Sequence, residues 1–359
     1  MLSLVRHLVR SWTDGAIRDL EGFRRGLMES FPLHEDPPAT TPYDVIYEGG
    51  KVRLRHYGAI GSPHSIPLIL VYALIKRPYI LDLQRGRSVV ENLTRQGFNV
   101  YLIDWIPPTR SDTGRGFDAY VNGDLVNAVR VVQDREAVDQ VTLLGYCFGA
   151  LLATIYAALH PAAVKNLITL TIPFDAEAMH EIPAFALIDR LEPSAIDLIA
   201  DMYGNCPAWL VRLGFMSMAP LHHALDKHVD LYRGLDRPGY AETFALFERW
   251  MSDDVPLAGR IFREVTTDIF RKNLLSQNRL EVGGRKVDVA AISCPILNVI
   301  GEYDDVVPPA ASRPFIASVG SSDKRNLEFP NGHMGLAVSG AAQTKLWPEV
   351  GSWVEERSF

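Results

Sequence analysis

The most constraining feature of this sequence is a short apolar run that leads into a cysteine between two glycines and then into a helix-like stretch. Residues 141–144 have the character of a buried strand, residues 145–149 read Gly-Tyr-Cys-Phe-Gly, and residues 150–159 are apolar and of helical length. Two glycines permit a sharp turn in which the central residue adopts a strained conformation. This strand–turn–helix pattern is typical of a nucleophile elbow, with a thiol in place of the more usual hydroxyl.

The position of Cys147 favours a reactive thiol. Its sulfur would lie at the N-terminus of the following helix, where the helix dipole stabilises a thiolate. A lone cysteine is more often buried and inert, and we interpret Cys206 and Cys294 in that way. We therefore predict that Cys147 is the catalytic nucleophile.

Strand-like and helix-like stretches alternate along most of the chain. The strand-like stretches are short runs rich in Val, Ile and Leu, as expected for strands buried on both faces of a parallel sheet. They cover residues 67–72, 99–103, 141–144, 167–171 and 295–300. Helix-like stretches cover residues 81–96, 117–135 and 148–159, and an alternating hairpin over residues 43–47 and 52–57 would form an antiparallel edge turned by Gly49-Gly50.

This order predicts an α/β fold of the α/β-hydrolase type: a mostly parallel twisted sheet with helices on both faces and an inserted helical cap. We assign residues 1–40 to an amphipathic helical segment and linker, and residues 41–173 and 291–359 to the core. Residues 174–290 contain helical patterns without a convincing buried strand, so we assign them to the cap. A cap at this place would cover the active site and restrict water.

In this fold the acid and the histidine follow the nucleophile in chain order, each from a loop after a late strand. Asp304 follows the strand at residues 295–300, and His333 follows a short strand at residues 326–329. We predict that His333 removes protons and that Asp304 orients it, with Asp305 and Glu302 as rival acids. The expected oxyanion hole consists of two backbone N–H groups, those of Phe148 and Leu74.

Composition excludes several other functions. The net charge of −7 gives no general attraction to nucleic acid, and no apolar run is long enough to span a bilayer. We expect no metal and no cofactor, because the remaining histidines lack metal-ligand spacing and no glycine-rich phosphate loop is present. These histidines include His160, His222, His223 and His228. Three scattered cysteines and the lack of a signal-peptide pattern predict a reducing cytoplasm.

Several segments beyond the elbow resemble one family, the catalytic subunits of class III polyhydroxyalkanoate synthases. The resemblance runs from about residue 41 to the C-terminus and is carried by motifs in matching order and spacing. These motifs are Val-Tyr-Ala-Leu-Ile-Lys-Arg-Pro-Tyr at 71–79, Val-Tyr-Leu-Ile-Asp-Trp at 100–105, Tyr-Val-Asn-Gly at 120–123, Leu-Gly-Tyr-Cys-Phe-Gly at 144–149, Ala-Leu-His-Pro at 158–161, Gly-Gly-Arg-Lys-Val-Asp at 283–288 and Phe-Pro-Asn-Gly-His at 329–333.

The resemblance implies that the chain polymerises (R)-3-hydroxyacyl-CoA, with 3-hydroxybutyryl-CoA as the expected substrate, through an acyl group linked to Cys147. It places Cys147, Asp304 and His333 in the family's triad. It also implies a small non-catalytic synthase subunit as a partner, a homodimer or hetero-oligomer, and attachment to a polymer granule surface.

Three positions near the expected site depart from the family's pattern. Lys76 stands where Asn is usual, Ile106 replaces Gly, and Asp305 replaces the His that normally follows the triad aspartate. The same triad would also serve a cysteine-dependent thioesterase, an esterase or a synthase-like transferase making short products. A non-catalytic synthase partner or granule-binding protein is the alternative from a different functional class.

Overall fold

The computed structural model describes residues 40–190, 192–218 and 239–358. The chain divides into two compact units, and the larger comprises residues 39–219 and 253–359. Within the smaller unit the described part is essentially one helix, α9 (Tyr240–Ser252). The predicted amphipathic segment at residues 1–40 lies outside the described residues, except for its last position.

An eight-stranded sheet forms the centre of the larger unit, with the order β1-β2-β6-β3-β7-β8-β11-β12. The strands are β1 (Asp44–Gly49), β2 (Val52–Tyr57), β3 (Leu68–Val71), β6 (Val100–Trp105), β7 (Val141–Tyr146), β8 (Val164–Leu170), β11 (Ile296–Gly301) and β12 (Lys324–Phe329). The six strands from β6 to β12 in that order are mutually parallel, and β1 and β2 form the antiparallel edge. Strands β3, β6, β7 and β11 are buried along their whole length, as their continuous apolar sequences predict.

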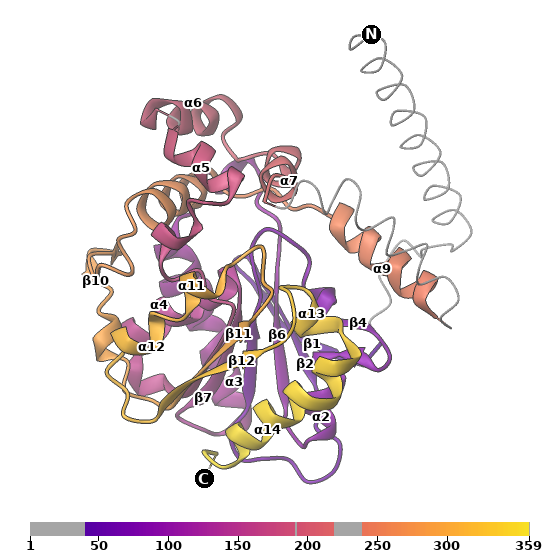
Figure 1. Cartoon of the computed structure of the whole chain (residues 1–359). Coiled ribbons are helices and arrows are strands. Elements are labelled where there is room, and N and C mark those ends of the chain that lie inside the picture. Colours follow the sequence, from indigo (N-terminus) through magenta and orange to yellow (C-terminus); the bar gives the residue numbers. More distant parts are fainter. Residues whose placement is uncertain (1–39, 191, 219–238, 359) are drawn as a thin grey trace. The chain divides into compact units, whose positions relative to one another are not determined.

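Helices cover both faces of this sheet, which confirms the predicted fold class (Figure 1). Helices α2 (Val89–Arg95) and α14 (Trp347–Glu355) contact each other. Helices α3 (Val126–Glu136) and α4 (Phe148–Leu159) pack on β7, and every residue of α4 is buried. The predicted helix at residues 117–135 begins with a π-helical turn, η3 (Ala119–Leu125), that contacts α4.

One predicted helix is shorter than its sequence pattern suggested. Residues 81–96 were expected to be helical, but the α-helix begins only at Val89. The preceding residues form a small hairpin of β4 (Asp82–Gln84) and β5 (Arg87–Ser88), turned through Gly86 at φ +74°. Ser88 then caps α2 by accepting a hydrogen bond from the Glu91 N–H at 2.9 Å.

Between β8 and β11 the larger unit contains mainly helices. They are α5 (Pro183–Arg190), α6 (Pro193–Tyr203), α7 (Ala208–Met216), α10 (Gly259–Glu264) and the π-helical η7 (Val265–Arg271), followed by a hairpin of β9 (Glu281–Val282) and β10 (Arg285–Lys286). The Asn205 side chain donates to the Thr109 carbonyl at 2.7 Å, and the Arg260 N–H donates to the Thr113 carbonyl at 2.8 Å. Since Thr109 and Thr113 lie in the loop after β6, these helices contact the carboxyl edge of the parallel sheet.

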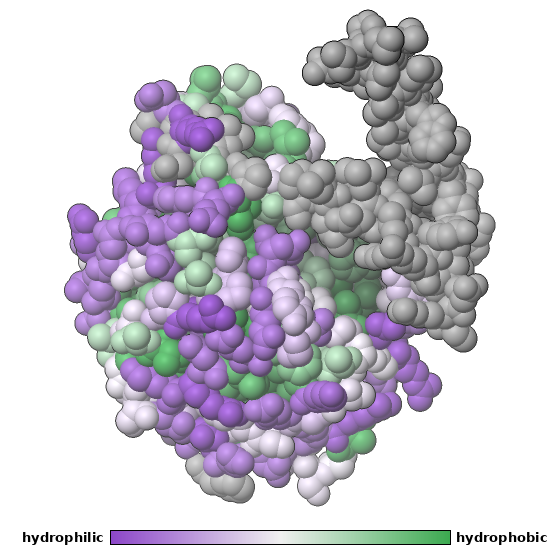
Figure 2. Space-filling view, in the orientation of Figure 1, coloured by the Kyte–Doolittle hydropathy of each residue, from purple (hydrophilic) through white to green (hydrophobic). Residues whose placement is uncertain are grey.

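Helices α6 and α7 expose several large apolar side chains, and Figure 2 shows apolar residues at the surface in the region where Figure 1 labels them. These are Leu198, Met202, Tyr203, Trp209, Leu213 and Met216. Among the described residues, none of the helices combines the length and the apolar character that crossing a bilayer requires.

Short helical turns complete the larger unit. They are η1 (Pro78–Leu81), η2 (Arg110–Asp112), η4 (Pro161–Ala163), η5 (Ala176–Met179), η8 (Val289–Ala291), α11 (Pro309–Ser312), α12 (Phe315–Ser318), α13 (Gly335–Val338) and η9 (Ala342–Leu346).

Candidate active site

Cys147 lies in a strained turn between β7 and α4. Its backbone has φ 55° and ψ −120°, a conformation that residues with side chains rarely adopt. A Cβ atom at Gly145 would lie 2.5 Å from the Ala150 Cα, and one at Gly149 would lie 2.0 Å from the Val71 carbonyl oxygen. Only glycine fits at either flank, so the sequence pattern and the tight turn share one steric cause. The Cys147 side chain is partly exposed.

The structure brings His333 and Asp304 together at the same edge of the sheet. The Nδ1 atom of His333 lies 2.7 Å from Oδ2 of Asp304, and both side chains are buried. The other carboxylate oxygen accepts hydrogen bonds from the N–H groups of Val306 at 2.9 Å and Val307 at 2.8 Å. This cradle fixes the carboxylate, which in turn orients the imidazole ring.

The rival acids are placed elsewhere. Glu302 and Asp305 are both exposed, whereas Asp304 is 5% exposed and bonded to the histidine. The neighbouring residues Asp304 and Asp305 therefore differ sharply, since the first is buried and the second is exposed to solvent. The other two departures from the family pattern are also ordered, since the Ile106 N–H donates to the Lys51 carbonyl at 2.9 Å and Lys76 is buried.

The electrostatic setting of His333 favours its protonated form. Burial alone would lower the pKa of this imidazole, but its electrostatic interactions with Asp304 and Cys147 and its hydrogen bond to Asp304 raise it to about 10. The sulfur and the carboxylate thus both favour the protonated imidazole. This arrangement suits a group that donates a proton early in a reaction and takes one back later.

Tyr146 is a site residue that the sequence reasoning missed. Its hydroxyl donates to the His333 carbonyl at 2.9 Å, and its ring stacks on the imidazole with centroids 5.2 Å apart. Its position immediately before Cys147 could have indicated this contact, because the last residue of the buried strand packs against the groups around the nucleophile. Tyr146 therefore supports His333 from the backbone side.

The predicted oxyanion donors flank the turn. Phe148 is the first residue of α4, so its N–H has no acceptor within the helix. Val71 ends β3 in contact with Gly149, and Leu74 follows three residues later in a buried loop. The loop after β3 thus lies close to the first turn of α4, and the role of the two N–H groups stays a prediction.

The other cysteines differ from Cys147. Burial raises the pKa of both the Cys206 and the Cys294 thiol to about 12, which is unfavourable for a thiolate. His222, His223 and His228 lie outside the described residues. Within the described part of the chain, no three His, Cys, Asp or Glu side chains group as metal ligands would.

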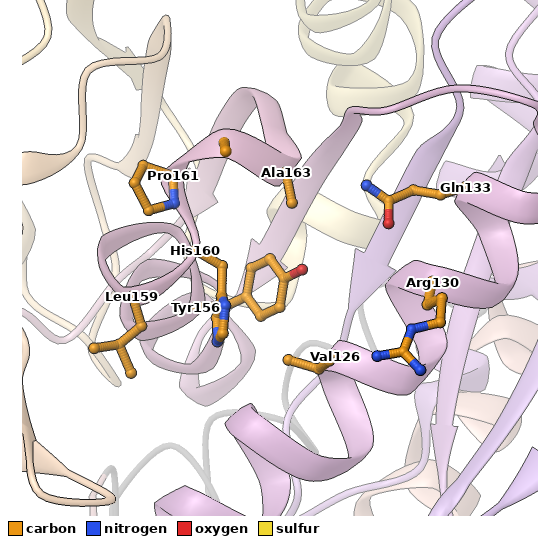
Figure 3. A pocket seen from close by; sticks show the side chains of 9 residues that line it. Val126, Arg130, Gln133, Tyr156, Leu159, His160, Pro161 and Ala163 are labelled. Atoms are coloured by element: carbon orange, nitrogen blue, oxygen red, sulfur yellow. The ribbon is translucent and has the colours of Figure 1, made fainter.

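The larger unit also has a surface pocket of about 370 Å³ (Figure 3). Arg130 of α3 and Tyr156 and His160 at the end of α4 are among its lining residues. Because α4 has 12 residues, its two ends are about 18 Å apart. The pocket is therefore at the opposite end of the helix from Cys147.

Comparisons with known proteins support the fold and identify the family. A family model described as alpha/beta hydrolase fold matches residues 66–339. The solved structure of a monoacylglycerol lipase from Paleococcus ferrophilus superposes with a TM-score of 0.54, covering 86% of this chain and 100% of that one, at 15% identity. That likeness concerns the fold alone.

Curated relatives are more informative. A poly(3-hydroxyalkanoate) polymerase subunit PhaC from Haloferax mediterranei is 40% identical over 89% of this chain and 64% of its own length. A protein of the same name from Thiocystis violacea is 36% identical over 89% of both chains. This chain belongs to the poly(3-hydroxyalkanoate) polymerase PhaC family.

Membership of the PhaC family confirms the predicted resemblance and, at the level of the family, the enzyme class, an acyltransferase of the polyhydroxyalkanoate synthase type. The chain spans just under two thirds of the Haloferax relative and most of the Thiocystis one. The catalytic roles of Cys147, Asp304 and His333 stay predictions from the sequence.

Proposed function

We propose that this protein polymerises (R)-3-hydroxyacyl-CoA, with 3-hydroxybutyryl-CoA as a substrate, by a Cys147-linked acyl-enzyme. The observation that carries the proposal is the buried His333, which Asp304 contacts at 2.7 Å and whose pKa is raised by Asp304 and by Cys147, in a chain of the PhaC family. A thiol at a strained elbow beside an ionised imidazole is suited to acyl transfer.

In the first step the Cys147 sulfur attacks the thioester carbonyl carbon. A new carbon–sulfur bond forms, the bond to the CoA sulfur breaks, and the proton held on His333 moves to the departing CoA thiolate. One thioester replaces another, so the free energy of the acyl-enzyme is close to that of the substrate thioester. The N–H groups of Phe148 and Leu74 stabilise the transient oxyanion.

In the second step the hydroxyl of another 3-hydroxyacyl unit attacks the acyl-enzyme. His333, now neutral, takes the hydroxyl proton and returns one to the Cys147 sulfur as the carbon–sulfur bond breaks. The product is an oxoester one unit longer. Asp304 stabilises the imidazolium each time it forms, which fits its two backbone hydrogen bonds and its burial.

Water competes with the hydroxyl in that second step, and the helices of the larger unit between β8 and β11 would limit its access. Their contacts with the loop after β6 put them at the carboxyl edge of the sheet, the edge from which Cys147, Asp304 and His333 all follow their strands. We assign them the role of the cap that residues 174–290 were predicted to form.

We also propose a second subunit as a partner. The support is that the curated relatives are named subunits of a polymerase. A homodimer or hetero-oligomer and attachment to a polymer granule stay predictions from the family resemblance.

The deciding experiment is the product formed from 3-hydroxybutyryl-CoA by the purified protein, with and without a co-expressed small subunit. We expect release of free CoA together with polymer or oligomer. Free 3-hydroxybutyrate as the sole product would instead establish a thioesterase. Absence of any acyl group on the protein, with binding to a synthase or granule, would establish a non-catalytic partner.

A matched variant isolates the nucleophile. Cys147→Ala should bind substrate but show neither CoA release nor an acyl group by intact-protein mass spectrometry, and far-UV circular dichroism should show that the variant is folded. Cys206→Ala serves as the control, because its thiol is buried and burial raises its pKa to about 12. Turnover that survives in Cys147→Ala would contradict the proposed intermediate.

A further inference from the structure

A buried ion pair connects the loop after β3 to the segment that begins at Asp253. The Lys76 ammonium contacts the Asp254 carboxylate, and the two side chains are only 3% and 8% exposed. The same two residues form an isolated antiparallel backbone bridge. Phe215 of α7 covers the ammonium at 5.4 Å, and Arg212 lies 3.8 Å from the carboxylate.

The pair closes one end of a short loop whose other end is also fixed. At Tyr72 the carbonyl accepts a hydrogen bond from the Trp105 indole at 2.8 Å, and the Tyr72 ring meets Tyr146 edge-on at 5.7 Å. Only three residues, from Ala73 to Ile75, lie between Tyr72 and Lys76. Leu74, the proposed oxyanion donor, is the middle one.

We propose that Lys76 and Asp254 are positioning residues that hold this loop so that the Leu74 N–H faces the carbonyl oxygen bound at Cys147. The inference rests on the proposed function. It adds that the segment beginning at Asp253 holds one of the two oxyanion donors in position. An oxyanion donor must be fixed before the reaction, because its contribution falls steeply when it is misplaced. Two anchors four residues apart provide that fixation.

The burial of the pair fits positioning. Desolvation lowers the pKa of Lys76, and the hydrogen bond and charge of Asp254 oppose this effect. A buried charge pair contributes little net stability compared with an apolar pair of similar size, whereas it specifies one arrangement of the groups it joins. A pair that joins a loop beside the nucleophile to the cap side of the chain therefore specifies the loop.

The neighbouring pair supplies a matched control. Arg77 and Asp253 join the same two segments one residue further along, with nitrogen and oxygen 3.7 Å apart and side chains 35% and 36% exposed. An exposed pair of this kind is screened by solvent and holds its partners weakly. Replacing it should leave the loop unchanged.

The test compares two reactions of the same sulfur. Acylation of Cys147 by 3-hydroxybutyryl-CoA develops an oxyanion, whereas alkylation by iodoacetamide displaces iodide and needs no oxyanion donor. In Lys76→Met/Asp254→Leu, which removes both charges together and so leaves neither buried alone, we expect the saturating acylation rate constant to fall about tenfold or more. The half-saturating substrate concentration and the alkylation rate should stay within about twofold.

Each outcome has a distinct meaning. Wild-type acylation in the double variant would overturn the positioning role, and so would an equal loss of acylation and alkylation, which indicates general damage to the elbow. The Arg77→Gln/Asp253→Asn variant should acylate at the wild-type rate, and a tenfold loss there would also overturn it. Failure of the wild-type protein to acylate at all would remove the proposed function instead.

Discussion

A histidine lies near each end of α4, and the comparison shows what makes one of them a candidate catalyst. His333 lies beside Cys147 at the N-terminal end, and His160 caps the C-terminal end beside the surface pocket. The pKa of His333 is raised to about 10, whereas that of His160 is lowered. The shifts have opposite directions although burial acts on both histidines in the same sense.

The neighbours account for the difference. Burial lowers the pKa of each histidine, but Asp304 and Cys147 outweigh it at His333. At His160 the charge of the Arg285 guanidinium lowers the pKa further, and the hydrogen-bond partner is the neutral Asn122 amide at 2.9 Å. Asp304 and Cys147 thus favour the protonated form of His333, whereas burial and Arg285 disfavour that of His160.

The largest effect should come from replacing each histidine in turn. His333→Gln should lower CoA release from 3-hydroxybutyryl-CoA by about 10²- to 10⁴-fold, because both steps lose their proton carrier. His160→Gln keeps a side chain that can bond to Asn122 and should stay within about threefold. A thiol-detecting assay of free CoA measures both, and similar losses in the two variants would contradict the comparison.

The glycines near the two ends should differ in the same way. Gly149→Ala places a Cβ 2.0 Å from the Val71 carbonyl oxygen and should destabilise the fold by about 1–3 kcal/mol or more. Gly123, next to the His160 partner Asn122, has open space around its Cα, and Gly123→Ala should be stabilising by about 0.5–1 kcal/mol. Urea unfolding of the two variants measures both values, and equal costs would show that the elbow is not sterically closed.

The sequence predicted the N-terminal end of α4 far better than its surroundings. Strand, two glycines and helix are consecutive, so local sterics determine the turn, and the predicted helix at residues 148–159 matches α4. Asp304 and His333 could be chosen because they follow strands whose carboxyl ends share one edge.

The features that the sequence did not predict depend on contacts between distant residues or on the conformation of a single turn residue. The Lys76–Asp254 pair joins residues 178 positions apart, and no local pattern marks it. The stacking of Tyr146 on His333 requires the sheet to be assembled first. The first half of the helix expected at residues 81–96 is instead a hairpin. Its turn depends on the positive φ of Gly86, which apolar periodicity does not reveal.

The smallest effect should be seen in how the two histidines titrate. A raised pKa means that the folded protein binds a proton that the unfolded chain releases near 6.5, so the stabilisation from His333 is present below pH 6.5 and is lost as pH rises towards 10. His160 has the opposite sign, because its lowered pKa makes the unfolded chain bind the proton first, and stability from this group falls as pH drops below 6.5.

Removing the sulfur separates the two contributions at His333. In Cys147→Ala the electrostatic contribution of the sulfur disappears but Asp304 remains, so the His333 pKa should fall below its wild-type value and stay above that of His160. NMR titration of the two imidazoles in wild type and variant measures this directly, with His160 as the internal control. An unchanged His333 titration would mean that the sulfur is not electrostatically coupled to the imidazole, and the proposed proton transfer between them would lose its physical basis.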